Sequence, residues 1–123
     1  LFTKYHKGSI LKTNVKTDTI ISPKLGKQPS YKNNKMIDAS ATCYKNQICL
    51  SIVNKSANKN IELKSPYLDK INTTFTINGE NKTDLNSYEN NTKVKIKRNI
   101  LKFKSNIIIL PPHSINLIVF KNC

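Results

Sequence analysis

The segment Ile107–Phe120, IIILPPHSINLIVF, places two apolar runs on either side of a double proline, a histidine and a serine. Successive residues of a strand point to opposite faces, so runs that are apolar at successive positions predict strands buried on both faces. Pro111 and Pro112 cannot donate ladder hydrogen bonds and must interrupt the sheet between the two runs. We therefore predict a sharp corner that joins two core strands.

His113 and Ser114 raise an alternative, a nucleophilic serine beside its base. Adjacent strand residues diverge, however, and the small-residue elbow that exposes a catalytic serine is missing around Ser114. The Ser114 hydroxyl can instead bond to backbone groups freed by the corner. The corner is the favoured interpretation, and no catalytic residue is predicted in this segment.

Short strand patterns separated by polar turns continue upstream of this segment. They cover residues 36–44 and 48–54, which form a hairpin, and then 60–66, 71–79, 93–98 and 100–105. Residues 9–23 have an extended pattern, 24–35 are expected to be a loop, and 80–94 form the longest polar loop. In 93–98 Val94 and Ile96 alternate with lysines, which predicts a strand with one wet face. The pattern indicates an all-β fold, an antiparallel β-sandwich of jelly-roll or Greek-key type.

The N-terminal residues form the one helical pattern. Leu1, Phe2 and Tyr5 are apolar or aromatic at helical spacing, and Gly8 is a natural stop. The chain starts without methionine on what looks like the end of a helix. We expect residues 1–8 to be the remnant of a helix from a preceding domain that this chain lacks, and residues 9–123 to be the β-sandwich. At 123 residues the chain is long enough for a single core.

The chain is strongly basic, with a formal net charge of +14 and a pI near 9.9. Such a charge attracts polyanions. Arg98 is the only arginine, however, and nucleic-acid readers favour arginine for its bidentate contacts. A nucleic-acid partner is therefore not expected. A polyanion-binding face would need gathered lysines, and the candidates are Lys93, Lys95, Lys97, Lys102 and Lys104. No run approaches the ~20 apolar residues of a membrane span.

The chain has three cysteines, of which Cys43 and Cys49 flank the hairpin turn YKNQI. A three-residue loop over Lys45–Gln47 would place them opposite each other, close enough for a disulfide. Two small buried thiols are an equal alternative, and a two-residue loop would break the pairing. Cys123 would then be left over, free or bonded to another chain. A disulfide would indicate an oxidising compartment.

Four N-glycosylation sequons permit a secretory, extracellular origin without requiring it. Their acceptors are Asn54, Asn72, Asn81 and Asn90. Tyr31, Tyr67 and Tyr88 lie in or beside loops and are the candidates for a carbohydrate platform, although capping of the sandwich core is the favoured role.

The chemistry-bearing residues predict neither a metal site nor a cofactor. Cys43 and Cys49 lack C-x-x-C spacing, and the isolated glycines form no phosphate-binding loop. Glu80 and Glu89 share the long loop and could in principle form a glycosidase-like pair. Such a pair needs a rigid pocket, so solvated loop acids are the favoured interpretation.

Several segments in one fixed order carry a resemblance to a known family. They are LFTKYHKGSIL, ISP followed by a loop, IDASATCYKNQICLSIVNKS, TINGENKTDLNSYENNTKV and ILPPHSINLIVF. Together they resemble the C-terminal end of α-L-arabinofuranosidases of glycoside hydrolase family fifty-one. The resemblance implies an Ala-rich strand at Ala39 and Ala41, a strand that ends in Val-Asn-x-Ser at Ser56, and a closing Leu-Pro-x-x-Ser corner at Ser114.

The resemblance implies a parent that is a retaining glycoside hydrolase, with two glutamates at the strand ends of a (β/α)₈ barrel. That barrel is absent from this chain, so no catalytic residue is carried over. The expected function is a non-catalytic C-terminal domain that packs against the barrel, in the same protein or in a companion chain, and stabilises it. Leu1, Phe2 and Tyr5 are the expected barrel-packing residues. The alternative is an independent carbohydrate- or polyanion-binding module. Glycans and an oligomeric assembly are further candidate partners.

Overall fold

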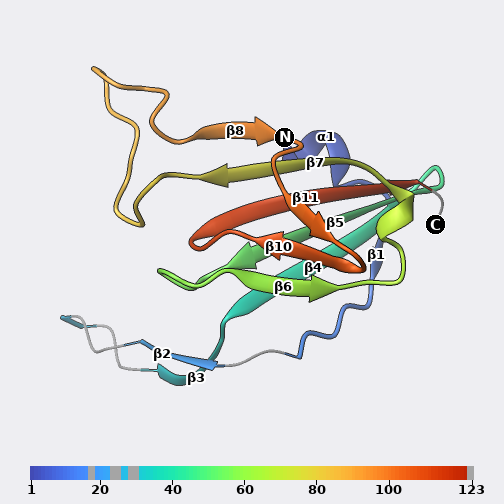
Figure 1. The fold of residues 1–123 in the computed structure, drawn as a ribbon, viewed down its shortest axis with the longest axis horizontal. Coiled ribbons are helices and arrows are strands. Elements are labelled where there is room, and N and C mark those ends of the chain that lie inside the picture. The colour runs from blue at the N-terminus through green and yellow to red at the C-terminus, as the bar shows by residue number, and fades with distance from the viewer. Residues whose placement is uncertain (17–18, 23–25, 28–30, 122–123) are drawn as a thin grey trace.

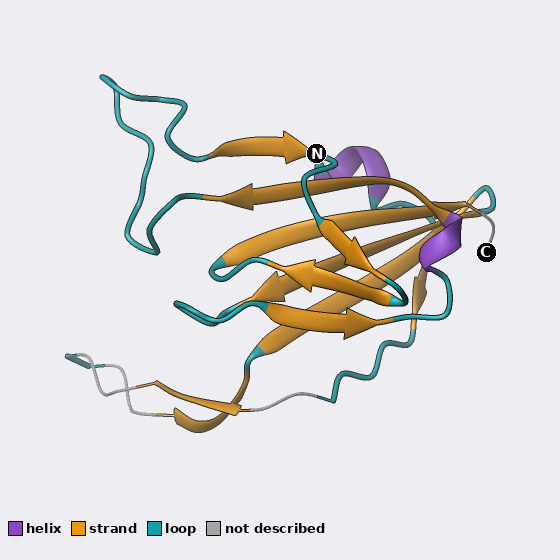
Figure 2. Ribbon diagram, viewed as in Figure 1, coloured by secondary structure: helices purple, strands orange, loops and turns teal. Residues whose placement is uncertain are grey.

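The chain folds into three antiparallel sheets (Figures 1 and 2). The computed structural model describes residues 1–16, 19–22, 26–27 and 31–121, with side chains for 1–16, 26–27 and 35–121. The six-stranded sheet has the order β1-β4-β5-β11-β7-β8, the three-stranded sheet β6-β10-β9, and the ribbon β2-β3. The bounds are α1 Phe2–Tyr5, β1 Ser9–Leu11, β2 Thr19–Ser22, β3 Tyr31–Lys35, β4 Ile37–Tyr44, β5 Gln47–Asn54, β6 Ile61–Lys64, the 3₁₀ turn η1 Leu68–Lys70, β7 Ile71–Asn78, β8 Lys95–Arg98, β9 Lys102–Lys104, β10 Ile107–Leu110 and β11 Ser114–Lys121.

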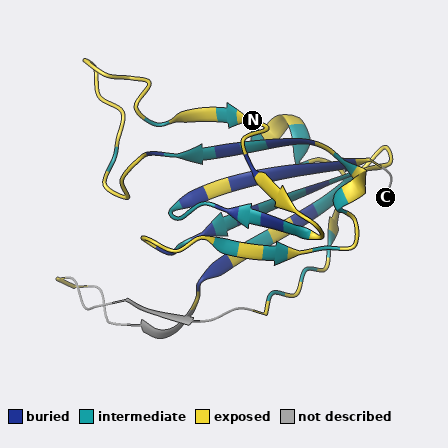
Figure 3. Cartoon of the chain, in the orientation of Figure 1, coloured by how far each residue is buried: buried dark blue, intermediate teal, exposed yellow. Residues whose placement is uncertain are grey.

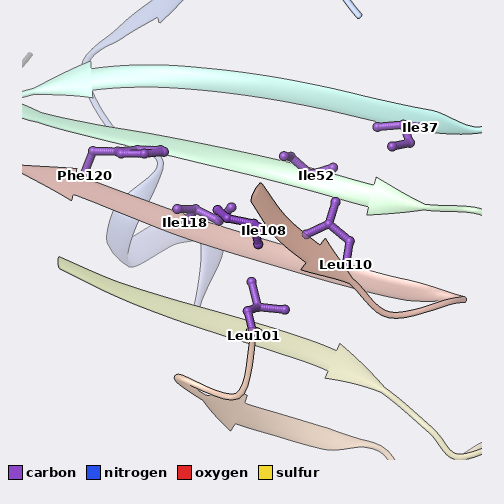
Figure 4. Packing of buried hydrophobic residues seen from close by; sticks show 7 residues of the cluster. All are labelled: Ile37, Ile52, Leu101, Ile108, Leu110, Ile118 and Phe120. Carbon is purple, nitrogen blue, oxygen red and sulfur yellow. The ribbon is translucent and has the colours of Figure 1, made fainter. Parts of the chain in front are cut away.

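The six-stranded and three-stranded sheets pack face to face around one hydrophobic core (Figure 4). Ile52, Ile118 and Phe120 project from the larger sheet, and Ile108 and Leu110 meet them from β10. Ile108, Leu110 and Ile118 have no exposed surface. The prediction of an antiparallel β-sandwich is confirmed.

Strand β11 lies in the middle of the larger sheet and is buried on both faces from Asn116 to Phe120, whereas Ile115 near its start is exposed (Figure 3). It pairs with β5 on one side and β7 on the other. Ile118 and Phe120 point into the core between the sheets. Leu117 and Val119 point to the opposite, outer face and are each 1% exposed, so something must cover that face as well.

The cover is the N-terminal turn α1, which lies on the opposite side of the larger sheet from β6 and β10 (Figure 1). The Tyr5 ring contacts Phe75, which pairs with Leu117 on the outer face. Gly8 then turns the chain into β1 with φ +79°, and a β-carbon there would collide with the Cys43 carbonyl oxygen. Only glycine fits this approach. The helix itself ends at Tyr5 with His6 as its C-cap, so the prediction that Gly8 stops the helix is wrong.

The β4–β5 hairpin has a two-residue loop. Tyr44 pairs with Gln47, and Lys45 and Asn46 have φ values of 47° and 62°. Two successive positive φ angles are what a tight hairpin turn requires. Of the two loop lengths left open by the sequence, the structure therefore has the two-residue loop, which does not place Cys43 opposite Cys49.

Two other expectations about strands are wrong. Residues 31–35 lie in the expected loop 24–35 but form β3, whose backbone pairs with β2. In β8, Ile96 is 52% exposed and Lys97 is half-buried, the reverse of the expected alternation. The pairs Thr76–Lys97 and Ile77–Ile96 explain this, because Thr76 faces inward and is fully buried.

Candidate docking site

The proline corner is a structural element. Ser114 is 1% exposed, and its hydroxyl donates to the Pro111 carbonyl at 2.6 Å and accepts from the Asn116 amide at 2.8 Å. The His113 ring points elsewhere, with Nδ1 3.1 Å from the Ala57 carbonyl oxygen and Nε2 3.2 Å from that of Gly79. The two side chains therefore serve different contacts, and the prediction of a corner is confirmed.

The buried side chain of Asn54 stabilises the proline corner through hydrogen bonds to backbone groups. Its amide nitrogen lies 3.1 Å from the carbonyl oxygen of Lys59, 3.3 Å from that of Leu110 and 2.8 Å from that of Pro111. Its Oδ1 accepts from the Ser56 backbone N–H at 3.0 Å. Asn54 is 1% exposed and its amide nitrogen is engaged in these bonds, so the folded chain does not present it as a glycosylation acceptor. Asn72, Asn81 and Asn90 are exposed, and their glycosylation stays a prediction.

Of the two alternatives for Cys43 and Cys49, the structure excludes a disulfide between them. The two-residue loop pairs Cys43 with Ile48 and Cys49 with Thr42, so the two thiols lie on opposite faces of the sheet. Cys49 is a free, buried thiol, and burial raises its pKa to about 11. Cys43 is disulfide-bonded. Cys123 lies outside the described residues.

The acidic residues of the long loop do not form a catalytic pocket. Glu80 and Glu89 are both exposed. Asp84 accepts from the Asn81 backbone N–H at 2.9 Å and pairs with Lys93 at 3.3 Å, and these contacts lower the pKa of its carboxyl. Within the described ranges no three His, Cys, Asp or Glu residues gather to hold a metal ion. No helix in the same ranges is long and apolar enough to cross a membrane.

The candidate lysines come from two different sheets, although Lys97 and Lys102 line the same cavity. Lys95 and Lys97 belong to β8 in the larger sheet, whereas Lys102 and Lys104 belong to β9 in the smaller one. Lys97 is half-buried, and its Nζ donates to Asn78 Oδ1 at 3.1 Å. The positive charge is therefore spread over two sheets.

A cavity of about 590 Å³ opens beside β4, where the three-stranded sheet is too narrow to cover the six-stranded sheet. No pattern in the sequence predicted this cavity. Leu50 and Phe120 form part of its apolar lining, and Asn14, Tyr67 and Lys70 bring polar atoms to it. The Tyr67 ring is 58% exposed, with Lys70 Nζ 5.4 Å from its centroid. The Tyr88 ring is fully exposed on the long loop, and the Tyr31 side chain lies outside the described ones.

The N-terminal turn is the best candidate for contact with another domain. Leu1, Phe2 and Tyr5 are half-buried, so each keeps part of its surface open. Phe2 stacks on His6 with a centroid distance of 6.1 Å, and His6 Nδ1 lies 3.3 Å from the Thr42 hydroxyl. Burial lowers the pKa of His6. Because the turn has only four helical residues, its packing on the sheet must stabilise it.

Comparison with known proteins identifies the fold. No protein-family model and no curated protein matches the chain. Among solved structures, a thermostable GH51 α-L-arabinofuranosidase from Thermotoga petrophila RKU-1 matches with a TM-score of 0.78 at 19% identity, over 97% of this chain and 27% of that one. The α-L-arabinofuranosidase from Thermotoga maritima, in an arabinose complex, matches with a TM-score of 0.76 at 18% identity, over 98% of this chain and 27% of that one. A family 51 α-L-arabinofuranosidase from Bifidobacterium longum matches with a TM-score of 0.75 at 17% identity, over 98% of this chain and 23% of that one. The expected resemblance is confirmed for the fold, and the chain spans about a quarter of these enzymes.

Proposed function

We propose that this chain is the non-catalytic C-terminal, jelly-roll-type β-sandwich of an α-L-arabinofuranosidase-like glycoside hydrolase, and that it packs against and stabilises a catalytic (β/α)₈ barrel. One observation carries the proposal: the fold matches arabinofuranosidases over 97% of this chain but only 27% of theirs. Residues 1–8 would be the end of a barrel helix, and residues 9–123 the sandwich.

The packing of the N-terminal turn supports this division. A four-residue helix is not stable alone, because the unfavourable free energy of helix nucleation exceeds the favourable free energy of one hydrogen-bonded turn. Tyr5 against Phe75 and His6 against Thr42 hold the turn on the outer face of the sheet. A helix that continued upstream of Leu1 would therefore be fixed to the sandwich at its last turn, which joins two domains rigidly.

The chemistry of the parent enzyme would lie in the barrel. Barrel enzymes carry their catalytic residues at the C-terminal ends of the strands, and retaining glycosidases use two carboxylates about 5 Å apart. The corner residues His113 and Ser114 serve structural contacts, and Glu80 and Glu89 are solvated. The contribution of this chain is to bury one flank of the barrel.

We place the protein in an oxidising, extracellular or secretory compartment. The disulfide at Cys43 supports this placement, because such bonds persist where thiols are not kept reduced. The exposed sequons at Asn72, Asn81 and Asn90 are compatible with a glycoprotein.

A truncation experiment tests the function. The gene is expressed with the sequence upstream of Leu1, once complete and once ending before Ser9, and 4-nitrophenyl α-L-arabinofuranoside is the substrate. We expect the complete protein to hydrolyse it, the truncated one to melt at a lower temperature, and residues 1–123 alone to be inactive. Hydrolysis by residues 1–123, or an upstream sequence that encodes no barrel, would overturn the proposal.

The cavity beside β4 favours a second candidate function, an independent carbohydrate-binding module. An exposed tyrosine ring can stack on a sugar, and the rim offers hydrogen-bond donors from Lys70 and Asn14. Calorimetric titration with arabinan and xylan oligosaccharides tests it, with Tyr67→Ala as the variant and Tyr88→Ala as the control. Binding lost only in Tyr67→Ala would support this function, and no heat of binding would dismiss it.

A further inference from the structure

The outer face of the six-stranded sheet carries an apolar row that the N-terminal turn leaves open. Val53 pairs with Ile115, Ile115 with Ile77, and Ile77 with Ile96, so four side chains from β5, β11, β7 and β8 stand in one line. We call these four residues the outer row. Neighbouring strands lie about 4.8 Å apart, so the row is roughly 15 Å long.

The outer row is accessible. Ile96 is 52% and Ile115 37% exposed, and Val53 and Ile77 are half-buried. An antiparallel sheet with one face in water normally carries polar residues on that face. Contiguous exposed apolar residues mark an interaction surface, because their hydration is unfavourable and a partner removes that cost.

The outer row continues the surface that the N-terminal turn already covers. Phe75 and Leu117 pair with each other and lie two residues from Ile77 and Ile115, on the same face. The Tyr5 ring packs 5.2 Å from the Phe75 ring. One part of the outer face is therefore buried by the turn, and the adjoining part is the open row.

Charged groups frame the row. Asp38 pairs with Val53 across the strands and forms a 3.0 Å ion pair with Lys55. On the β7–β8 side, the Arg98 guanidinium lies 5.8 Å from the Phe75 ring centroid, and its Nε donates to the Thr73 hydroxyl at 3.2 Å. An apolar centre with a polar rim is the composition of a protein–protein contact.

We propose that the outer row is the contact surface for the domain that precedes Leu1, the catalytic barrel of the proposed function, on which this inference rests. Two observations select this occupant over a second copy of the chain. The N-terminal turn lies on the same face of the sheet as the outer row, so a domain joined to this turn would lie next to that face. The matched enzymes are about four times as long as the part of them that matches this chain, so they have room for a further domain.

Cysteine labelling tests the contact. Ile96→Cys and, as the matched control, Leu85→Cys are made both in residues 1–123 and in the protein that includes the upstream sequence. Leu85 is 68% exposed on the long loop, away from the row. The native Cys49 thiol is buried, so we expect it to react slowly with maleimide. The measured quantity is the rate of maleimide labelling of each variant.

We expect labelling of the Ile96→Cys variant to slow by at least about tenfold when the upstream domain is present, with Leu85→Cys labelled equally in both proteins. Equal rates for Ile96→Cys would overturn the contact surface while leaving the proposed function standing, since the truncation experiment tests that separately. Slow labelling in residues 1–123 alone that speeds up on dilution would show that a second copy covers the row, and would also overturn the inference.

Discussion

Asn54→Ala should be among the most destabilising single substitutions in this chain. The change leaves the Leu110 and Pro111 carbonyls without their amide donor and the Ser56 N–H without its acceptor. Asn54 is 1% exposed, so water cannot replace these bonds without opening the corner. Each buried hydrogen bond contributes about 1 kcal/mol, and each buried group left unpaired costs ~1–3 kcal/mol.

Allowing for relaxation of the corner, the loss should be roughly 2–4 kcal/mol of unfolding free energy. In a domain of this size that lowers the melting temperature by roughly 8–16 °C. Urea unfolding followed by circular dichroism measures the free energy. Asn58→Ala, an exposed asparagine in the same β5–β6 turn, is the matched control and should change stability by less than about 0.5 kcal/mol. If Asn54→Ala unfolds like the control, Asn54 does not hold the corner.

Three further predictions use other groups of the chain. Burial lowers the pKa of His6, so on acidification the imidazole is protonated in the unfolded chain before it is protonated in the folded one. The stability should therefore fall as the pH drops below about 6.5. The loss in melting temperature from pH 7.5 to 5.5 should be smaller in the His6→Gln variant, and equal losses in both proteins would contradict this assignment. Iodoacetamide should modify Cys49 only after unfolding and should never modify Cys43 unless a reductant is added, because Cys49 is buried with a pKa of about 11 and Cys43 is bonded; mass spectrometry of the peptides decides this. Secretory expression should leave Asn54 without a glycan even where Asn81 carries one, and a glycan on Asn54 of folded protein would refute its buried position.

The sequence predicted the elements whose side-chain pattern decides their environment. The run Leu117–Phe120 is apolar at every position, which indicates a strand covered on both faces, and all four residues are buried. The same prediction is wrong for Ile115, which is exposed on the outer face. Pro111 and Pro112 exclude a continuous strand, so the corner followed from backbone chemistry alone. Such predictions need no knowledge of which strands are neighbours.

Features that depend on register could not be read from the sequence. A difference of one residue in the length of the β4–β5 loop decides whether Cys43 and Cys49 lie on the same face of the sheet. The local composition is compatible with either loop length. The orientation of Ile96 depends on its pairing with Ile77, which the alternation of β8 cannot reveal. Asn54 lies in an ordinary sequon, and only the approach of the β10–β11 corner, 56 residues away, buries its amide.

Polar strands are a further case. The segment Tyr31–Lys35 has the composition of a loop, yet it forms β3 because its backbone pairs with β2. Backbone hydrogen bonds do not require apolar side chains, so a strand outside the core leaves little trace in the hydrophobic pattern.

The most direct test of the account is a crystal structure of the protein that includes the residues preceding Leu1. We predict a (β/α)₈ barrel with two glutamates at its strand ends, whose surface lies against Ile115 and Ile96 and removes both side chains from solvent. An upstream domain of another fold, or a barrel that leaves the outer row in open solvent, would contradict the account.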